Sequence, residues 1–330
     1  MKVAVFSTKP YDQKYFEQFN KNFHHELAFF DTNLNEQTTN LTRDFDAVCP
    51  FVNDKLDEQV IKLLAKNGVK LISLRSAGFN NVDLQAAEDN NIKVTRVPAY
   101  SPQAVAEHAL ALILTLNRKT HKAYNRVKEG NFSLNNLIGF NLYNKTIGVI
   151  GTGRIGVAFC HIMLGLGCKV VAYDIKKQES LEDKGVTYLS QEELYKQSDI
   201  ISLHCPLMPA TEHLINENSI AQMKDHVMII NTSRGGLIDT EAVIKNLKEK
   251  KVGYLGIDVY EQEEKVFFED KSEQIIEDDA LLRLISYPNV LITSHQAFLT
   301  DEALKEIAQT VLQNIDDFKE DRSLVNQVKS

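Results

Sequence analysis

The feature that most constrains this chain of 330 residues is a glycine-rich turn between two apolar runs, close to the middle of the sequence. The strand-like run Lys145-Thr-Ile-Gly-Val-Ile150 leads into Gly151-Thr-Gly-Arg-Ile-Gly156, a helical pattern follows, and the next apolar run ends on Asp174. This succession is typical of a parallel α/β fold that binds the pyrophosphate of a dinucleotide. Because a domain-sized length of chain precedes the glycine-rich turn, we expect two domains. Because the turn suits a dinucleotide, we expect a cofactor-dependent enzyme.

Each glycine of the turn has a separate physical task. Gly151 permits a tight turn, Gly153 lets backbone N–H groups approach phosphate, and Gly156 allows the helix to pack closely on the strand. Asp174 can accept hydrogen bonds from the ribose hydroxyls of NAD and repels the 2′-phosphate of NADP, although two lysines follow it. We therefore expect NAD as cofactor; the alternative is a glycine-rich turn that binds nothing.

Composition excludes several other classes of protein. A net charge of −8 argues against a nucleic-acid surface, and no apolar run reaches the roughly 18 residues of a membrane span. The N-terminal residues read as a first strand and lack the features of a signal peptide. The four cysteines have no CxxC spacing, so we expect reduced thiols in a cytoplasmic protein and no metal site.

The alternation of strand and helix signals sets the domain organisation. We expect two Rossmann-like or flavodoxin-like α/β domains with parallel sheets and an active-site cleft between them. A substrate-binding domain comprises residues 1–100 plus 300–330, because the helix predicted at 301–317 returns to it; residues 101–299 form the NAD-binding Rossmann domain. An apolar helix from Pro102 connects the domains, and the acidic stretch 261–279 is expected to be a surface loop.

Polar or turn-forming residues follow the predicted strands of the second domain. They are Gly151, Asp174, His204-Cys205-Pro206, Asn231-Thr-Ser-Arg234, Asp258 and Ser294-His295. The carboxyl ends of parallel strands meet at one edge of a sheet, where ligands of such folds gather. The sequence therefore predicts a binding site at this edge.

Three of the residues near this edge suit the chemistry of a 2-oxo acid. His295 is the best general acid, and the carboxylate of Glu263 could keep it protonated, because an opposite charge favours the imidazolium. Arg234 could bind a carboxylate through two parallel hydrogen bonds. The residues alone leave ordinary roles open: a structural histidine, a solvated acid and a structural ion pair.

Several motifs together resemble the NAD-dependent D-2-hydroxyacid dehydrogenases. They are the 151–156 turn with Asp174, His204-Cys-Pro206, Asn231-Thr-Ser-Arg-Gly-Gly236, Gly256-Ile-Asp-Val-Tyr-Glu-Gln-Glu263 and Thr293-Ser-His-Gln-Ala-Phe298. Two more, Arg75-Ser-Ala-Gly-Phe-Asn-Asn-Val-Asp83 and Val97-Pro-Ala-Tyr-Ser-Pro102, resemble the bacterial fermentative D-lactate dehydrogenase branch. The resemblance covers nearly the whole chain.

The resemblance implies a role for each site residue. Arg234 would hold the 2-oxo acid, His295 would donate the proton, and Glu263 would tune His295. The implied cofactor contacts, in addition to the three glycines, are Val105, Arg154, Ile155, Asp174, Cys205, Pro206, Thr211, Thr232, Ser233 and Asp258. The implied substrate contacts, besides Arg234 and His295, are the Ala77 and Gly78 backbone, Tyr100, and a small apolar pocket bounded by Phe51 and Phe298.

The prediction is therefore a D-lactate dehydrogenase that reduces pyruvate with NADH, reversibly, after the two domains close around the substrate. The partners expected are a small 2-oxo or 2-hydroxy acid and a second copy of the chain, in a homodimer or homotetramer. One alternative is a dehydrogenase of the same family for a bulkier 2-oxo acid. The other is a non-catalytic NAD(H)-sensing binding protein with the same fold.

Overall fold

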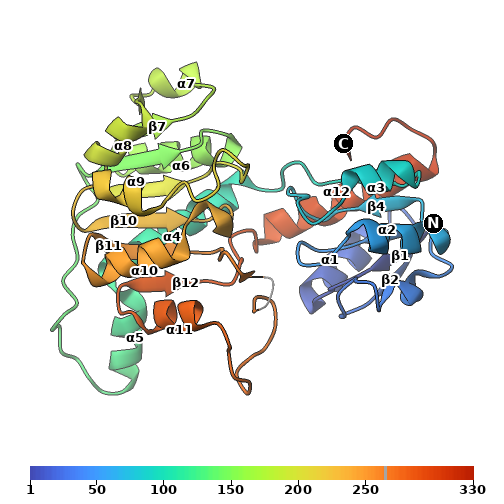
Figure 1. Cartoon of the computed structure of the whole chain (residues 1–330), viewed down its shortest axis with the longest axis horizontal. Coiled ribbons are helices and arrows are strands. Elements are labelled where there is room, and N and C mark those ends of the chain that lie inside the picture. Colours follow the sequence, from blue (N-terminus) through green and yellow to red (C-terminus); the bar gives the residue numbers. More distant parts are fainter. Residues whose placement is uncertain (264–265) are drawn as a thin grey trace. The chain divides into compact units, whose positions relative to one another are not determined.

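The computed structural model describes residues 1–263 and 266–330, and the chain forms two compact units (Figure 1). The first comprises Met1–Ser101 and Phe298–Ser330, and the second comprises Pro102–Ala297. The first unit is therefore discontinuous in sequence. None of the helices in the described residues has the length and hydropathy of a membrane span.

A six-stranded sheet forms the centre of the first unit, in the order β13-β5-β4-β3-β1-β2. Its strands are β1 (Lys2–Val5), β2 (Glu26–Phe29), β3 (Ala47–Cys49), β4 (Leu71–Ser73), β5 (Lys93–Thr95) and β13 (Gln327–Val328). Every pair is parallel except β13 with β5, so the sheet is parallel, as predicted, apart from this one edge strand. A short C-terminal strand needs no crossover helix to pair in this antiparallel way.

The helices of this unit are α1 (Pro10–Asn20), α2 (Glu58–Lys66), α3 (Leu84–Asp89) and α12 (Asp301–Lys319), with the 3-10 helix η1 (Thr39–Thr42). Thr300 caps α12 by accepting a hydrogen bond from the backbone of Ala303. The buried face of α12 packs against α1 and β4, which ties the end of the chain to its beginning. Strands β3 and β4 are buried throughout, as expected for parallel strands covered on both faces.

A seven-stranded parallel sheet forms the centre of the second unit, in the order β12-β11-β10-β9-β6-β7-β8. Its strands are β6 (Thr146–Ile150), β7 (Lys169–Tyr173), β8 (Thr187–Tyr188), β9 (Ile200–Leu203), β10 (Val227–Asn231), β11 (Val252–Ile257) and β12 (Val290–Ile292). From β6 the chain first adds β7 and β8 on one side and then returns to add β9 on the other. This reversal creates the crevice at which such sheets bind ligands.

The helices of the second unit are α4 (Pro102–Arg118), α5 (Thr120–Lys128), α6 (Arg154–Gly165), α7 (Glu179–Glu182), α8 (Gln191–Gln197), α9 (Glu217–Gln222), α10 (Thr240–Lys248) and α11 (Asp279–Ser286), with the 3-10 helix η2 (Gly235–Leu237). Helix α4 packs on α6 and β11, which explains why it is apolar on more than one face. The acidic stretch 261–279 is not entirely a surface loop, because Phe267 is buried in the core. Its residues 264–265 lie outside the described residues.

Candidate active site

The glycine turn joins β6 to α6 at the reversal point of the sheet. Gly151 has φ of +94°, and a Cβ on it would lie 2.5 Å from the backbone nitrogen of Cys205. A Cβ on Gly156 would lie 2.0 Å from the carbonyl oxygen of Gly151. Gly153 precedes α6 without a side-chain cap, and in the described part of the chain no atom beyond its own neighbours lies within 4 Å of the position its Cβ would take. The turn therefore leaves the helix N-terminus open to a phosphate group.

Asp174 follows β7, and its carboxylate is fixed against this turn. Its Oδ2 accepts hydrogen bonds from the backbone nitrogen of Thr152 at 2.5 Å and from the Thr152 hydroxyl at 3.1 Å. The hydroxyl of Tyr188 donates in turn to the Thr152 hydroxyl. Sequence reasoning missed Thr152 and Tyr188, because only the fold brings β8 to the turn. A fixed carboxylate beside open helix N–H groups fits the ribose and pyrophosphate of NAD.

The 204–211 segment follows β9, and the backbone of His204 and Cys205 lies against Gly151 of the glycine turn. The side chain of His204 is partly buried with Nδ1 shielded from solvent, lies 2.9 Å from the Ser202 hydroxyl through Nε2, and packs against Phe159. Burial lowers the pKa of His204 to about 3, so the ring is neutral at neutral pH. Thr211 donates a hydrogen bond from its hydroxyl to the Pro206 carbonyl at 2.7 Å.

The loop after β10 contacts this segment, since the Ser233 hydroxyl donates to the Cys205 carbonyl at 2.7 Å. The hydroxyl oxygen of the neighbouring Thr232 is buried and has no hydrogen-bond partner among the described residues. A buried polar atom of this kind calls for a ligand or water. The structure thus brings together five of the predicted cofactor contacts from two loops: Cys205, Pro206, Thr211, Thr232 and Ser233. Of the others, Val105 is buried in α4, while Arg154 and Ile155 begin α6.

His295 and Glu263 form a close pair. Nδ1 of His295 lies 2.9 Å from Oε1 of Glu263, and both side chains are largely but not fully buried. The other carboxylate oxygen of Glu263 accepts a hydrogen bond from the backbone nitrogen of Tyr260 at 2.9 Å. The ring of Phe268 packs against His295 with centroids 5.9 Å apart. The pairing fixes the orientation of the imidazole.

Asp258 organises the loop that carries His295. Its fully buried carboxylate accepts hydrogen bonds from the hydroxyl of Thr293 and from the backbone nitrogens of Gln296 and Ala297. The backbone nitrogen of His295, whose φ is +51°, donates to the Asp258 carbonyl at 2.7 Å. The Nε2 atom of His108, from α4, lies 3.3 Å from the Asp258 carboxylate. Sequence reasoning assigned Asp258 to the cofactor and missed the contributions of Thr293 and His108.

Arg234 stands in a tight loop between β10 and η2. The side chain of Asn231 closes this loop, donating to the carbonyl of Arg234 and accepting from the backbone nitrogen of Ser233. A Cβ on Gly235 would lie 2.2 Å from the carbonyl atoms of Tyr260, so the loop packs directly on the segment that carries Glu263. No carboxylate in the described part of the chain forms an ion pair with Arg234, and its guanidinium donates only to the carbonyl of Ser233 there. This removes support for the alternative of a structural ion pair.

The predicted substrate residues of the first unit form an aromatic group. The ring of Phe298 lies 6.1 Å from that of Phe51 and 6.3 Å from that of Tyr100, measured between centroids. The buried guanidinium of Arg75 lies over the Phe51 ring at 4.6 Å. The carbonyls of the Ala77-Gly78 turn accept hydrogen bonds from Arg96 and Ser76, respectively.

Comparison with known proteins gives the same assignment along the entire chain. The family model described as the NAD-binding domain of D-isomer-specific 2-hydroxyacid dehydrogenases matches residues 110–297. The D-lactate dehydrogenase of Escherichia coli K12 is 52% identical over 99% of this chain and 100% of its own. The apo structure of an Escherichia coli D-lactate dehydrogenase superposes with a TM-score of 0.92, at 50% identity, covering 99% of this chain and 100% of the other.

The D-lactate dehydrogenase of Aquifex aeolicus, solved with NAD and lactic acid, has a TM-score of 0.85 at 37% identity, covering 97% of this chain and 96% of the other. These similarities confirm the predicted α/β fold, the predicted cofactor and the predicted class of enzyme. The chain belongs to the D-isomer-specific 2-hydroxyacid dehydrogenases, which are NAD-dependent oxidoreductases that act on a CH–OH group.

Proposed function

We propose that the protein is a D-lactate dehydrogenase that catalyses the reversible reduction of pyruvate by NADH. The observation that carries this proposal is the pair of His295 and Glu263, joined at 2.9 Å beside the loop that presents Arg234. The extent of identity with the Escherichia coli enzyme supports pyruvate as the substrate.

The three side chains have complementary tasks in this reaction. Arg234 binds the carboxylate of pyruvate through its planar guanidinium. His295 donates a proton to the carbonyl oxygen from Nε2, because its Nδ1 is held by Glu263. NADH, when bound, would supply the hydride for the carbonyl carbon. With the proton from His295, the C=O group of pyruvate would become the CH–OH group of lactate.

The residues proposed to hold NAD are those of the two loops and the turn. The pyrophosphate is proposed to bind at the uncapped N-terminus of α6, with Arg154 and Ile155, and the ribose hydroxyls are proposed to bind Asp174. Cys205, Pro206, Thr211, Thr232, Ser233, Asp258 and Val105 complete the proposed set. Thr232 has the strongest support of these, because its buried hydroxyl oxygen has no partner among the described residues.

The first unit is proposed to bind the substrate, through residues 1–100 and 300–330 and the adjoining Phe298. The aromatic group of Phe51, Tyr100 and Phe298 would contact the methyl end of pyruvate, and the Ala77-Gly78 backbone would contact its polar end. The packing of Phe298 against both Phe51 and Tyr100 favours a small substrate over a bulkier 2-oxo acid. The closely paired His295 and Glu263 argue against a purely NAD(H)-sensing protein.

We also propose a homodimer or homotetramer in the cytoplasm. Large apolar side chains are exposed on α5 and on the extended segment that follows it along the outside of the second unit (Figure 1); they are Tyr124, Val127, Phe132, Leu134, Ile138 and Tyr143. Large apolar side chains exposed along one segment often mark a protein–protein interaction site. All four cysteines are buried free thiols, as expected in a reducing compartment.

The test is a panel of 2-oxo acids of increasing size, assayed with NADH and with NADPH and followed by chiral analysis of the product. The proposal predicts the highest kcat/KM for pyruvate with NADH and a product that is D-lactate. A higher kcat/KM for a branched 2-oxo acid would support the bulkier-substrate alternative. No turnover with any member of the panel would support the binding protein.

A further inference from the structure

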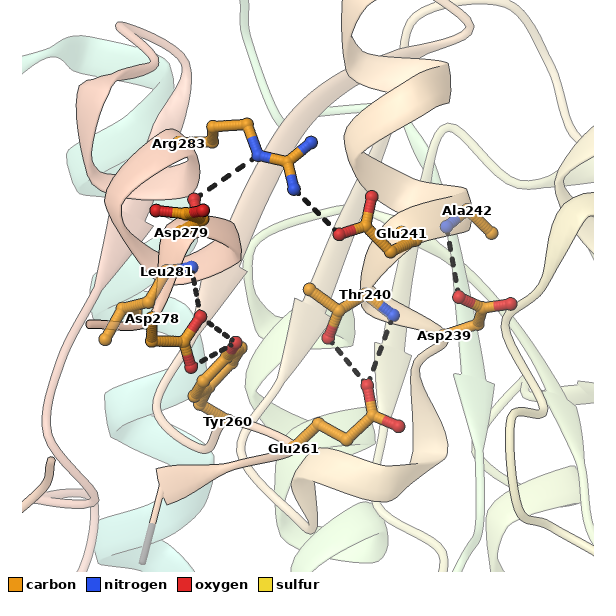
Figure 2. A network of polar contacts seen from close by, with 10 residues as sticks. All are labelled: Asp239, Thr240, Glu241, Ala242, Tyr260, Glu261, Asp278, Asp279, Leu281 and Arg283. Atoms are coloured by element: carbon orange, nitrogen blue, oxygen red, sulfur yellow. Dashed lines mark hydrogen bonds and ion pairs between the residues drawn. The ribbon is translucent and has the colours of Figure 1, made fainter. Parts of the chain in front are cut away.

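The segment that carries Glu263 is anchored on one side by Tyr260 (Figure 2). The Tyr260 hydroxyl donates to the Asp278 carboxylate, with distances of 2.8 and 3.0 Å to its two oxygens. Asp278 also caps α11 by accepting a hydrogen bond from the backbone nitrogen of Leu281. Burial, the bond to Asp278, and the nearby charges of Glu261 and Glu241 raise the pKa of Tyr260, so its hydroxyl remains a donor.

The next residue, Glu261, anchors the segment on the opposite side (Figure 2). One oxygen of its carboxylate accepts a hydrogen bond at 2.8 Å from the hydroxyl of Thr240, the first residue of α10. The other oxygen lies 2.6 Å from Nε2 of His213. The segment is therefore held between the N-terminal ends of α10 and α11. An ion pair between Glu241 and Arg283 at 2.8 Å also joins these two helices.

The Tyr260 backbone contacts two parts of the proposed active site: the Glu263 carboxylate and the loop that presents Arg234. The Tyr260 N–H group donates to the Oε2 atom of Glu263, whose Oε1 atom faces His295. The Tyr260 carbonyl lies against Gly235, so close that a Cβ there would be only 2.2 Å away. A shift of the Tyr260 peptide would therefore displace the Glu263 carboxylate and the loop that presents Arg234.

We infer that Tyr260 is a positioning residue: the bond from its hydroxyl to Asp278 fixes the peptide that orients Glu263 toward His295. This inference deepens the proposed function and rests on it. Neither residue of the anchor needs to touch the substrate or the cofactor. Only 3% of Tyr260 is exposed to solvent, so water does not readily replace its hydrogen bond to Asp278.

The test is the Tyr260→Phe variant, which keeps the buried ring, removes the hydroxyl and leaves Asp278 as the cap of α11. We expect a loss of about fivefold in kcat/KM at neutral pH, the factor that a single net hydrogen bond represents. The alkaline limb of the pH–rate profile should move to lower pH, because a less ordered Glu263 stabilises the protonated imidazole less well. NADH affinity, measured by fluorescence titration, should stay within twofold of that of the parent protein.

The matched control is Tyr287→Phe, since the Tyr287 hydroxyl is buried and bonds to no group in the residues the structure describes. It should leave the pH profile unchanged. In the double variant Tyr260→Phe/Glu263→Gln, the alkaline limb should be at the same pH as in Glu263→Gln alone, because the Tyr260 hydroxyl acts through Glu263. Additive shifts in the double variant would overturn the inference.

Two further results separate this inference from the proposed function. If the limb moves in Glu263→Gln but stays in place in Tyr260→Phe, the positioning role is wrong and the proposed function stands. If the limb also stays in place in Glu263→Gln, Glu263 does not tune His295 and the positioning role is wrong, whereas absence of turnover with the panel of 2-oxo acids would overturn the proposed function. Asp278→Ser gives an independent test should Tyr260→Phe fold poorly: serine still caps α11 but is too short to reach Tyr260. It should shift the limb as Tyr260→Phe does, and an unmoved limb would overturn the positioning role.

Discussion

Nδ1 of His295 lies 2.9 Å from Oε1 of Glu263, although the two residues are 32 positions apart in sequence. They follow β12 and β11, neighbouring parallel strands whose carboxyl ends meet at the same edge of the sheet. The contact leaves Nε2 as the ring nitrogen that can transfer a proton to a substrate. The acid–base chemistry proposed for this protein depends on that orientation.

Replacing Glu263 with glutamine, which removes the carboxylate 2.9 Å from Nδ1 of His295, should move the alkaline limb of the kcat/KM profile to lower pH. The reason is that the protonated imidazole loses a neighbouring negative charge. Steady-state rates with pyruvate between pH 5 and 9 measure the shift. Glu273→Gln, in the exposed part of the same acidic stretch, is the control and should not move the limb. An unchanged limb in Glu263→Gln would refute the pairing.

Replacing Gly156 with alanine should weaken NADH binding by at least about tenfold, because the new methyl group would lie 2.0 Å from the Gly151 carbonyl and force α6 away from β6. Fluorescence titration with NADH measures the loss. Gly165→Ala is the control at the far end of the same helix, where no atom lies within 4 Å of the added Cβ. Equal affinities in the two variants would contradict the packing role of Gly156.

Replacing Asp174 with asparagine should lower the preference for NADH over NADPH by about tenfold, which corresponds to roughly 1.4 kcal/mol. Asparagine keeps an oxygen that can accept from Thr152, but it lacks the charge that repels a 2′-phosphate. The ratio of kcat/KM values for the two cofactors measures the change. Asp183→Asn changes an exposed acid in the same unit and should leave the ratio as it is. A constant ratio in both variants would remove Asp174 from cofactor selection.

His204 should make the protein less stable in mild acid. Its folded-state pKa of about 3 lies below the usual value of about 6.5 in an unfolded chain, so only the unfolded chain takes up a proton as the pH falls below 6.5. From pH 7 to pH 5 this costs about 2 kcal/mol of the free energy of unfolding. His204→Gln lacks that proton, so the stability gap between parent and variant in urea should narrow by this amount. A gap of constant size would show that His204 is protonated in the folded protein.

Much of the fold could be predicted because its causes are local. Buried parallel strands such as β9 and β10 read as uninterrupted apolar runs, and the glycine turn has few other structural uses. The candidate site could also be predicted, because the carboxyl ends of these parallel strands lie at the same edge of the sheet. By contrast, the antiparallel pairing of β13 and the burial of Phe267 depend on tertiary contacts that leave no periodic pattern.

The supporting residues of the site also escaped prediction. The Tyr260 hydroxyl donates a hydrogen bond to Asp278, 18 residues later in the sequence. His108 contacts Asp258 from a helix that is distant in the sequence. A tyrosine or histidine of this kind looks like an ordinary core residue until the side chains around it are known. Hydrogen bonds between distant side chains are specific in space but have no spacing rule in sequence.

The most direct measurement of the central claim is the turnover of His295→Gln with saturating pyruvate and NADH, together with its affinity for NADH. Positioned proton transfer typically contributes roughly 10²–10⁴-fold to a rate, and glutamine cannot supply that proton. We expect a loss of turnover in this range while NADH binds with its normal affinity. Turnover close to that of the parent protein would contradict the role of His295 as the proton donor.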